Sequence, residues 1–159
     1  MHMLLFGRSK QTKGEKPVVG MNRNISYLCK KGDELDELGQ YEQAISYYDQ
    51  ALQTVPNDED ILNSKGVSLY NLDKNEDALS CFENALAINP NQDTVLYNKA
   101  VCLYKLKKYQ RAQIVVHKAI KINPNDIDYQ ELIKKINKQL LPQRWKINPH
   151  EIDWEKIKK

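Results

Sequence analysis

The histidines and carboxylates are the residues of this chain from which acid–base or metal chemistry would have to start. His2, His117 and His150 are far apart in the sequence, and His150-Glu151 lacks the second histidine that a zinc-protease helix needs four residues later. The acidic run at positions 33–37 is better explained as a wetted helix surface than as a cation site, because no loop holds its oxygens together. No glycine-rich phosphate loop occurs. We therefore expect no enzyme activity, no metal and no cofactor.

Three cysteines, Cys29, Cys81 and Cys102, are odd in number and lack the Cys-x-x-Cys spacing of metal and redox motifs. They indicate reduced thiols on half-buried helix faces. No apolar run approaches the roughly 20 residues that span a bilayer, and residues 1–6 are too short for a signal-peptide core. A soluble, cytoplasmic protein is the expectation.

One pattern recurs every 34 residues and predicts the fold. A Pro-Asn pair closes each copy, at Pro56, Pro90 and Pro124. Small residues and leucines keep the same register: Gly32, Gly66 and Ala100; Leu35, Leu69 and Leu103; Ala44, Ala78 and Ala112; Ala51, Ala85 and Ala119. A fixed period with matched residue types is typical of a solenoid built from small helical units.

Each unit is predicted to hold two helices, at about 25–38 and 41–54 in the first copy, with the small residues where the helices cross. The expected organisation is a basic flexible arm, three units, a capping helix and a tail with a short helix: residues 1–24, 25–58, 59–92, 93–126, 127–141 and 142–159. A cap is needed because a terminal unit otherwise leaves an apolar face open to water.

These positions resemble the tetratricopeptide repeat (TPR) over residues 25–126. The resemblance implies an all-α, right-handed solenoid of three helix-turn-helix repeats whose first helices line a concave groove. It also implies a scaffold or adaptor that binds a peptide or protein segment in that groove. The second-helix aromatic of the family is present as Tyr48 and Phe82 but is replaced by Val116, so the third repeat is expected to pack less bulk.

The resemblance assigns particular side chains to the groove. Asparagines there can both donate and accept hydrogen bonds to an extended backbone, and tyrosines offer flat contact area at low entropy cost. Polar residues on any wetted helix would look similar, and this alternative stays open. The candidates are Asp33, Asp36, Asn63, Val67, Tyr70, Asn71, Tyr97, Asn98, Val101, Tyr104 and Lys105.

Some family members hold the C-terminal carboxylate of chaperones with lysine, asparagine and arginine side chains. The matching positions here are Cys29, Asp33, Ser64, Thr94 and Asn98, none of which carries the residue required. Asp33 would also repel a carboxylate. The sequence therefore predicts a groove without this clamp.

Charge is distributed unevenly along the chain. Residues 1–24 carry +4, the first two units −5 and −4, the third +5 and residues 127–159 +3, which gives the net charge of +3. Such a field steers partners. It favours a partner with a basic segment at the first two units, docking of the basic arm onto the first unit, or head-to-tail self-association.

Two other functions remain open. The basic third unit and cap suggest association with nucleic acid, although few aromatics are interleaved; the residues concerned are Lys105, Lys107, Lys108, Arg111, Lys118, Lys134, Lys135 and Lys138. Trp145 and Trp154 either pack onto the last helices or offer an exposed anchor to a partner or a second copy.

Overall fold

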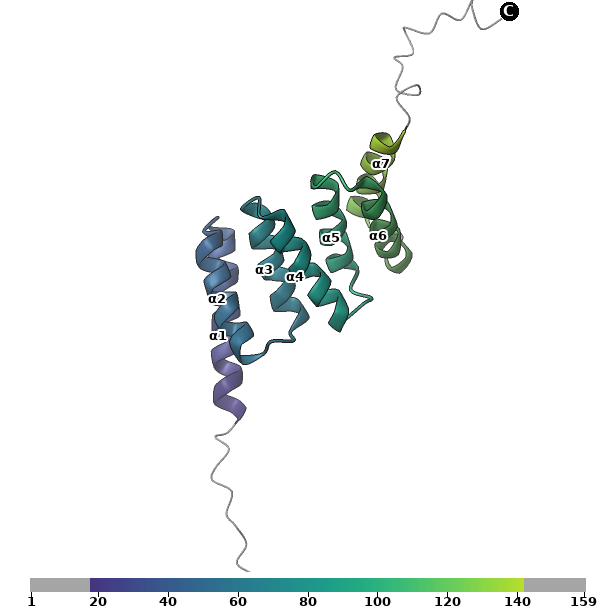
Figure 1. The fold of residues 1–159 in the computed structure, drawn as a ribbon. Coiled ribbons are helices and arrows are strands. Elements are labelled where there is room, and N and C mark those ends of the chain that lie inside the picture. Colours follow the sequence, from purple (N-terminus) through teal and green to yellow (C-terminus); the bar gives the residue numbers. More distant parts are fainter. Residues whose placement is uncertain (1–17, 142–159) are drawn as a thin grey trace, which may run out of the picture.

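A computed structural model describes residues 18–141, and all of its regular elements there are helices (Figure 1). In order they are α1 (Val18–Glu37), α2 (Tyr41–Thr54), α3 (Glu59–Asn71), α4 (Asn75–Ile88), α5 (Asp93–Lys105), α6 (Tyr109–Ile122) and α7 (Ile127–Leu140). The predicted all-α fold class is confirmed. None of these helices has the length and apolar character that a bilayer crossing demands.

The helices pack as successive pairs along the chain. The contacts are most extensive within the pairs α1–α2, α3–α4 and α5–α6, and α1, α3, α5 and α7 also touch in sequence (Figure 1). The first helices of the repeats therefore lie side by side and form one face of the array, which we call the first-helix face.

The N-terminal end of the described chain differs from the prediction, and parts of both ends lie outside the described residues. Helix α1 already begins at Val18, so residues 18–24 are helical where a flexible arm was expected. Pro17 explains the start, since proline is tolerated just ahead of a first turn and no breaker as strong follows it. The remainder of the arm, 1–17, and the tail, 142–159 with both tryptophans, are not described.

Small residues hold the helix pairs together, as the 34-residue register predicts. The alanines that recur in register in the second helices, such as Ala44, Ala78 and Ala112, are completely buried. Gly66 lies directly under the ring of Phe82: a Cβ atom there would stand 2.6 Å from the Cε1 atom of that ring. Gly32 has the same relation to the ring of Tyr48. The glycines thus make room for aromatic rings from the second helix.

The turn inside each repeat uses a left-handed residue at equivalent positions. Gly39, Asp73 and Lys107 have φ values of 70°, 61° and 58°. Glycine adopts this conformation without strain, whereas the two other side chains cost about 1 kcal/mol each. Gly39 therefore follows α1 in the left-handed conformation predicted for its C-terminal cap. Asp73 and Lys107 adopt the same backbone conformation at the equivalent positions of the second and third repeats.

The three cysteines differ in exposure, and this difference predicts their reactivity. Cys29 is half-buried, Cys81 is buried and Cys102 is completely buried, with its Sγ atom 3.0 Å from the carbonyl oxygen of Asn75. Burial, and secondarily the carboxylate of Glu76, raises the pKa of Cys102 to about 11. Burial also raises the pKa of Cys29 and of Cys81.

Iodoacetamide is therefore expected to label Cys29 first and Cys102 last when the folded protein is treated at about pH 8. The raised pKa alone lowers the thiolate fraction of Cys102 about a hundredfold. Time-resolved peptide mass spectrometry measures the order, with urea-unfolded protein as the control in which the three rates converge. Labelling of Cys102 as fast as Cys29 in the folded protein would contradict the packing.

Candidate functional site

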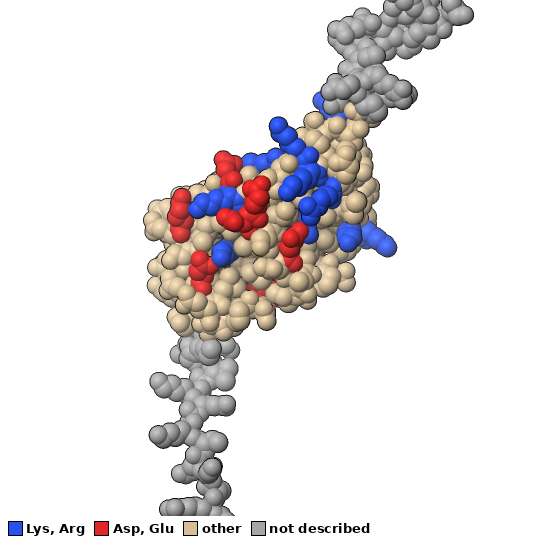
Figure 2. Space-filling model, viewed as in Figure 1, with Lys and Arg blue, Asp and Glu red and all other residues tan. Residues whose placement is uncertain are grey.

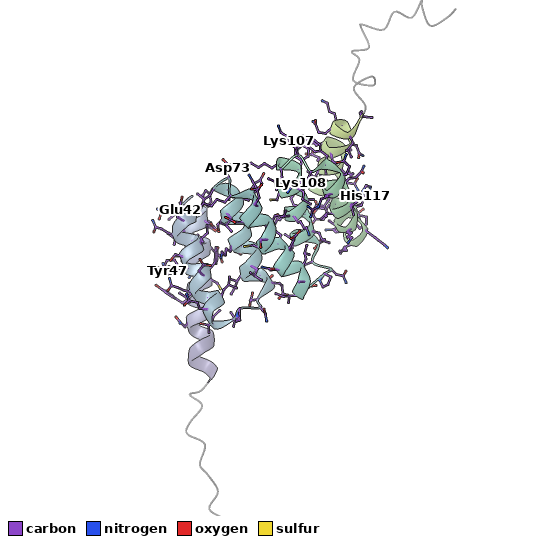
Figure 3. The ribbon with its side chains drawn as sticks, viewed as in Figure 1. Glu42, Tyr47, Asp73, Lys107, Lys108 and His117 are labelled. Carbon is purple, nitrogen blue, oxygen red and sulfur yellow. The ribbon has the colours of Figure 1, made fainter. Side chains whose placement is uncertain are left out.

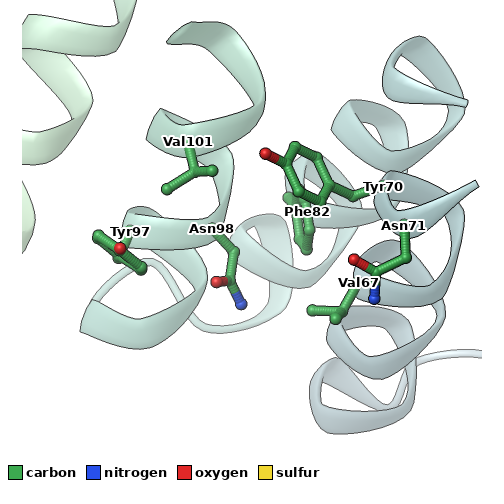
Figure 4. A pocket seen from close by; sticks show the side chains of 7 residues that line it. All are labelled: Val67, Tyr70, Asn71, Phe82, Tyr97, Asn98 and Val101. Atoms are coloured by element: carbon green, nitrogen blue, oxygen red, sulfur yellow. The ribbon is translucent and has the colours of Figure 1, made fainter. Parts of the chain in front are cut away.

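A pocket of about 200 Å³ opens between α3 and α5 on the first-helix face (Figure 4). We call it the central pocket. Its lining residues are Val67, Tyr70, Asn71, Phe82, Tyr97, Asn98 and Val101. Six of these were candidates from the sequence. The seventh, Phe82, comes from α4 and was expected only in the core.

Helical spacing brings these side chains together. Tyr70 and Asn71 follow Val67 on α3 by three and four residues. Tyr97 and Asn98 precede Val101 on α5 by four and three residues, so each trio lies on one side of its helix. Phe82 forms the floor, because Gly66 has no side chain to keep the ring out. The glycine at this register position was the sequence signal that an aromatic ring reaches the groove.

An asparagine pair lies beside the pocket. Asn98 Nδ2 donates a hydrogen bond of 2.9 Å to Asn63 Oδ1. The bond uses one hydrogen of Asn98 and one lone pair of Asn63, which leaves the Asn98 carbonyl oxygen and the Asn63 amide group with hydrogen-bonding capacity. Both side chains are half-buried. The pair therefore joins α3 to α5 and still offers a donor and an acceptor.

Aromatic contacts fix the wall of the pocket nearest the cap. The rings of Tyr97 and Tyr129 stack with centroids 5.0 Å apart, and the Tyr129 hydroxyl donates to Asp93 Oδ2 at 3.2 Å. Burial raises the pKa of Tyr129 to about 12. Burial, followed by the nearby Asp128 carboxylate, raises the pKa of Tyr97. Helix α7 thus stabilises the position of Tyr97.

The remaining candidates of the third repeat lie at one edge of this face. Lys105 Nζ is 4.4 Å from the centroid of the Tyr70 ring and forms an ion pair with Asp73. Tyr104 lies against Tyr109 with ring centroids 5.4 Å apart. Lys105 therefore lies against Tyr70, a residue of the pocket wall, and its charge is paired with that of Asp73. Tyr104 contacts the following helix.

Asp33 and Asp36 bind other side chains of the chain. The Tyr48 hydroxyl lies 2.8 Å from Asp33 Oδ1 and 2.9 Å from Asp36 Oδ2. The buried hydroxyl of Ser68 donates to Asp36, at 2.7 and 2.9 Å from its two oxygens. Burial raises the pKa of Tyr48, and these carboxylates add to that effect. The two aspartates connect α1 with α2, and Asp36 connects α1 with α3.

Most of the basic residues lie away from the central pocket. Lys107 and Lys108 are in the α5–α6 turn, and Arg111 and Lys118 are exposed on α6. Figure 3 labels the two lysines, and Figure 2 shows basic side chains gathered at this end of the array. Lys134, Lys135 and Lys138 are exposed on α7. The positive charge of the third repeat is therefore carried mainly by its second helix together with the turn that precedes it.

Two wider hollows lie between α2 and α4 over α3, with volumes of about 570 and 380 Å³. They share Leu62 and Asn84 in their linings and contain none of the predicted groove residues. Among residues 18–141, no three histidine, cysteine or acidic side chains gather as metal ligands. The central pocket is thus where the predicted candidates converge.

Comparisons with known proteins place the chain in a family. The model described as "Tetratricopeptide repeat" matches residues 69–136, and the one described as "TPR repeat" matches residues 32–73. No curated protein sequence matches the chain.

Solved TPR domains share the fold at low sequence identity. The first TPR of Spaghetti (RPAP3) bound to the HSP90 peptide SRMEEVD has a TM-score of 0.72 at 20% identity, covering 74% of this chain and 94% of that one. The Sgt2 TPR domain from Aspergillus fumigatus has a TM-score of 0.73 at 18% identity, covering 81% and 87%. The second TPR domain of human RPAP3, in complex with the HSP70 peptide SGPTIEEVD, has a TM-score of 0.70 at 15% identity, covering 74% and 98%. The chain belongs to the tetratricopeptide repeat family.

Proposed function

We propose that this protein is a non-enzymatic interaction adaptor that binds an extended peptide segment across α3 and α5, with one apolar side chain seated in the central pocket. The observation that carries the proposal is the convergence of Val67, Tyr97, Val101 and Phe82 around one opening, with asparagines at its side. Ligand sites are commonly apolar hollows with a few polar groups that fix orientation.

The chemistry of the pocket suits a peptide. Burial of one aliphatic side chain contributes about 1.5–3 kcal/mol. The unused donor of Asn63 and acceptor of Asn98 can pair with a peptide backbone, which presents one of each per residue. Peptides are also the ligands named for two of the similar solved domains, in RPAP3.

The proposed groove lacks the carboxylate clamp of chaperone-binding relatives. The corresponding positions hold Cys29, Asp33, Ser64, Thr94 and Asn98. None of these side chains is cationic, so nothing at these positions offsets the charge of a terminal carboxylate. We therefore propose that the ligand is held by its apolar side chain and backbone.

Filling the pocket is expected to abolish peptide binding. Peptides are first selected on the wild-type protein from a random phage-displayed library, and their affinities are then measured for the Val101→Trp variant. Because the indole occupies the space meant for the ligand side chain, we expect affinity to fall at least about tenfold, or about 1.4 kcal/mol.

Ile114→Trp is the matched control, since Ile114 is 61% exposed on α6, away from the pocket. It is expected to bind like the wild type. A second variant, Asn63→Ala with Asn98→Ala, removes both partners of the asparagine bond together and is expected to weaken binding while circular dichroism stays helical. If every selected peptide binds Val101→Trp and the double variant as it binds the wild type, the site assignment is wrong.

A further inference from the structure

Two carboxylates of α1 lie beside α3, the helix that forms one wall of the central pocket. Asp36 accepts hydrogen bonds from Ser68, the residue after the pocket-lining Val67, and Asp33 shares the Tyr48 hydroxyl with it. Asp33 is exposed and Asp36 half-exposed. Both oxygens of Asp36 accept from hydroxyl groups of the protein, and no cation lies among these bonding partners.

A second set of carboxylates borders the pocket on the α7 side. The Tyr97 ring lines the pocket and stacks on Tyr129, which places the first turns of α7 against this wall. Asp128 and Glu131 lie one residue before and two residues after Tyr129 in that helix and are exposed; Glu131 Oε2 is 3.8 Å from Lys135 Nζ, an exposed pair that leaves its carboxylate largely available. Their charges reach the pocket, since Asp128 and Glu131 are among the groups that raise the pKa of Tyr97.

One cation lies against a residue that lines the pocket, and its charge is already paired. Lys105 lies over one face of the Tyr70 ring and pairs with Asp73. Lys99, the other basic residue of α5, pairs with Glu83 of α4 at 3.1 Å, and Lys107, Lys108 and Arg111 lie in the α5–α6 turn and on α6. The chain as a whole has a net charge of +3, but the charges available on the two sides of the pocket are therefore acidic.

We propose that the central pocket selects an apolar side chain flanked by lysine or arginine residues, in contrast to the acidic peptides named for the RPAP3 domains. This inference rests on the proposed function and adds the charge of the ligand. Flanking cations of an extended peptide would lie on the two sides of the pocket where these carboxylates stand, and exposed charges interact over roughly 8 Å at physiological salt. Flanking carboxylates would meet repulsion at both ends.

Three labelled peptides, capped at both ends, test this by fluorescence polarisation: Gly-Arg-Arg-Leu-Arg-Arg-Gly, Gly-Glu-Glu-Leu-Glu-Glu-Gly and Gly-Arg-Arg-Gly-Arg-Arg-Gly. We expect the first to bind at least about tenfold more tightly than either of the others. Its affinity should also fall as salt is raised.

Paired variants locate the charge effect. Asp128→Asn with Glu131→Gln should weaken binding of the arginine–leucine peptide about three- to tenfold. Glu42→Gln with Asp77→Asn removes the same two charges from exposed positions on α2 and α4, and should leave the affinity within about twofold. This difference ties the preference to the border of the pocket rather than to net charge.

Each other result overturns the inference in a distinct way. Equal affinity for both leucine peptides would remove the charge preference, while the Val101→Trp test would still stand for the pocket. Equal affinity for both arginine peptides would indicate adsorption by charge without the pocket. Binding of none would remove basic flanks as the ligand chemistry, and the library selection would then decide the proposed function by itself.

Discussion

Replacing Gly66 with alanine is expected to lower the free energy of unfolding by about 2 kcal/mol, although alanine is the better helix former. The added Cβ atom would stand 2.6 Å from Cε1 of Phe82, closer than packed carbon atoms approach. The ring is almost completely buried, so relieving this contact requires the packed ring to shift toward the central pocket that it lines. Overpacking of about 1–3 kcal/mol therefore outweighs a helix-propensity gain below about 1 kcal/mol.

The third repeat shows which second substitution would relieve the clash introduced by Gly66→Ala. Where the first two repeats pair glycine with an aromatic ring, the third has Ala100 and Val116, both completely buried. We expect Phe82→Val alone to destabilise by about 2–3 kcal/mol through the cavity it leaves. In Gly66→Ala with Phe82→Val the methyl group has room, so the double variant should be no less stable than Phe82→Val.

Urea unfolding, monitored by circular dichroism, of the wild type, the two single variants and the double variant gives the coupling energy directly. A compensating coupling of about 2 kcal/mol is expected. Simple addition of the two losses would mean that the alanine acts on something other than the Phe82 ring.

The architecture was predictable because the residues that specify it act locally and recur. A Pro-Asn pair stops a helix wherever it occurs, and the alanines mark the helix contact in every copy. The second helix predicted at about 41–54 coincides with α2, and the segment predicted for a cap contains α7. One alanine is a weak signal by itself, but alanines at the same position of three repeats define a consistent register.

The composition of the site was only partly predictable, because it depends on pairs of residues from different repeats. Placing Val67 and Val101 on first-helix faces needed only helical spacing. That Asn98 bonds to Asn63, and Asp36 to Ser68, depends on how neighbouring repeats are aligned. That Phe82 reaches the pocket floor depends on the absent side chain of Gly66. Gly66 was a local signal for the position of the Phe82 ring, whereas no local pattern in the sequence specifies the two hydrogen-bonded pairs between repeats.

Asp36→Ala is expected to destabilise the protein by about 1–2 kcal/mol, well beyond the effect of Asp33→Ala. Asp36 accepts hydrogen bonds from Ser68 and Tyr48, and both donors are almost completely buried. A buried donor that loses a charged acceptor costs about 1–3 kcal/mol. The lower part of that range applies because Ser68 can turn to the carbonyl of Ser64 at 3.1 Å and Tyr48 retains Asp33.

The comparison with Asp33→Ala decides what Asp36 is for. Asp33 is exposed and bonds to Tyr48, which retains Asp36 when Asp33 is removed, so we expect a loss below about 0.5 kcal/mol. A cycle of Asp36→Ala with Ser68→Ala, measured by urea unfolding, should give a coupling of about 1 kcal/mol between the first two repeats. If Asp36→Ala leaves stability unchanged and weakens peptide binding, its carboxylate serves the ligand and the bond to Ser68 does not support the fold. If stability falls as expected, Asp36 holds α1 against α3, and its charge reaches a ligand only through that fixed position.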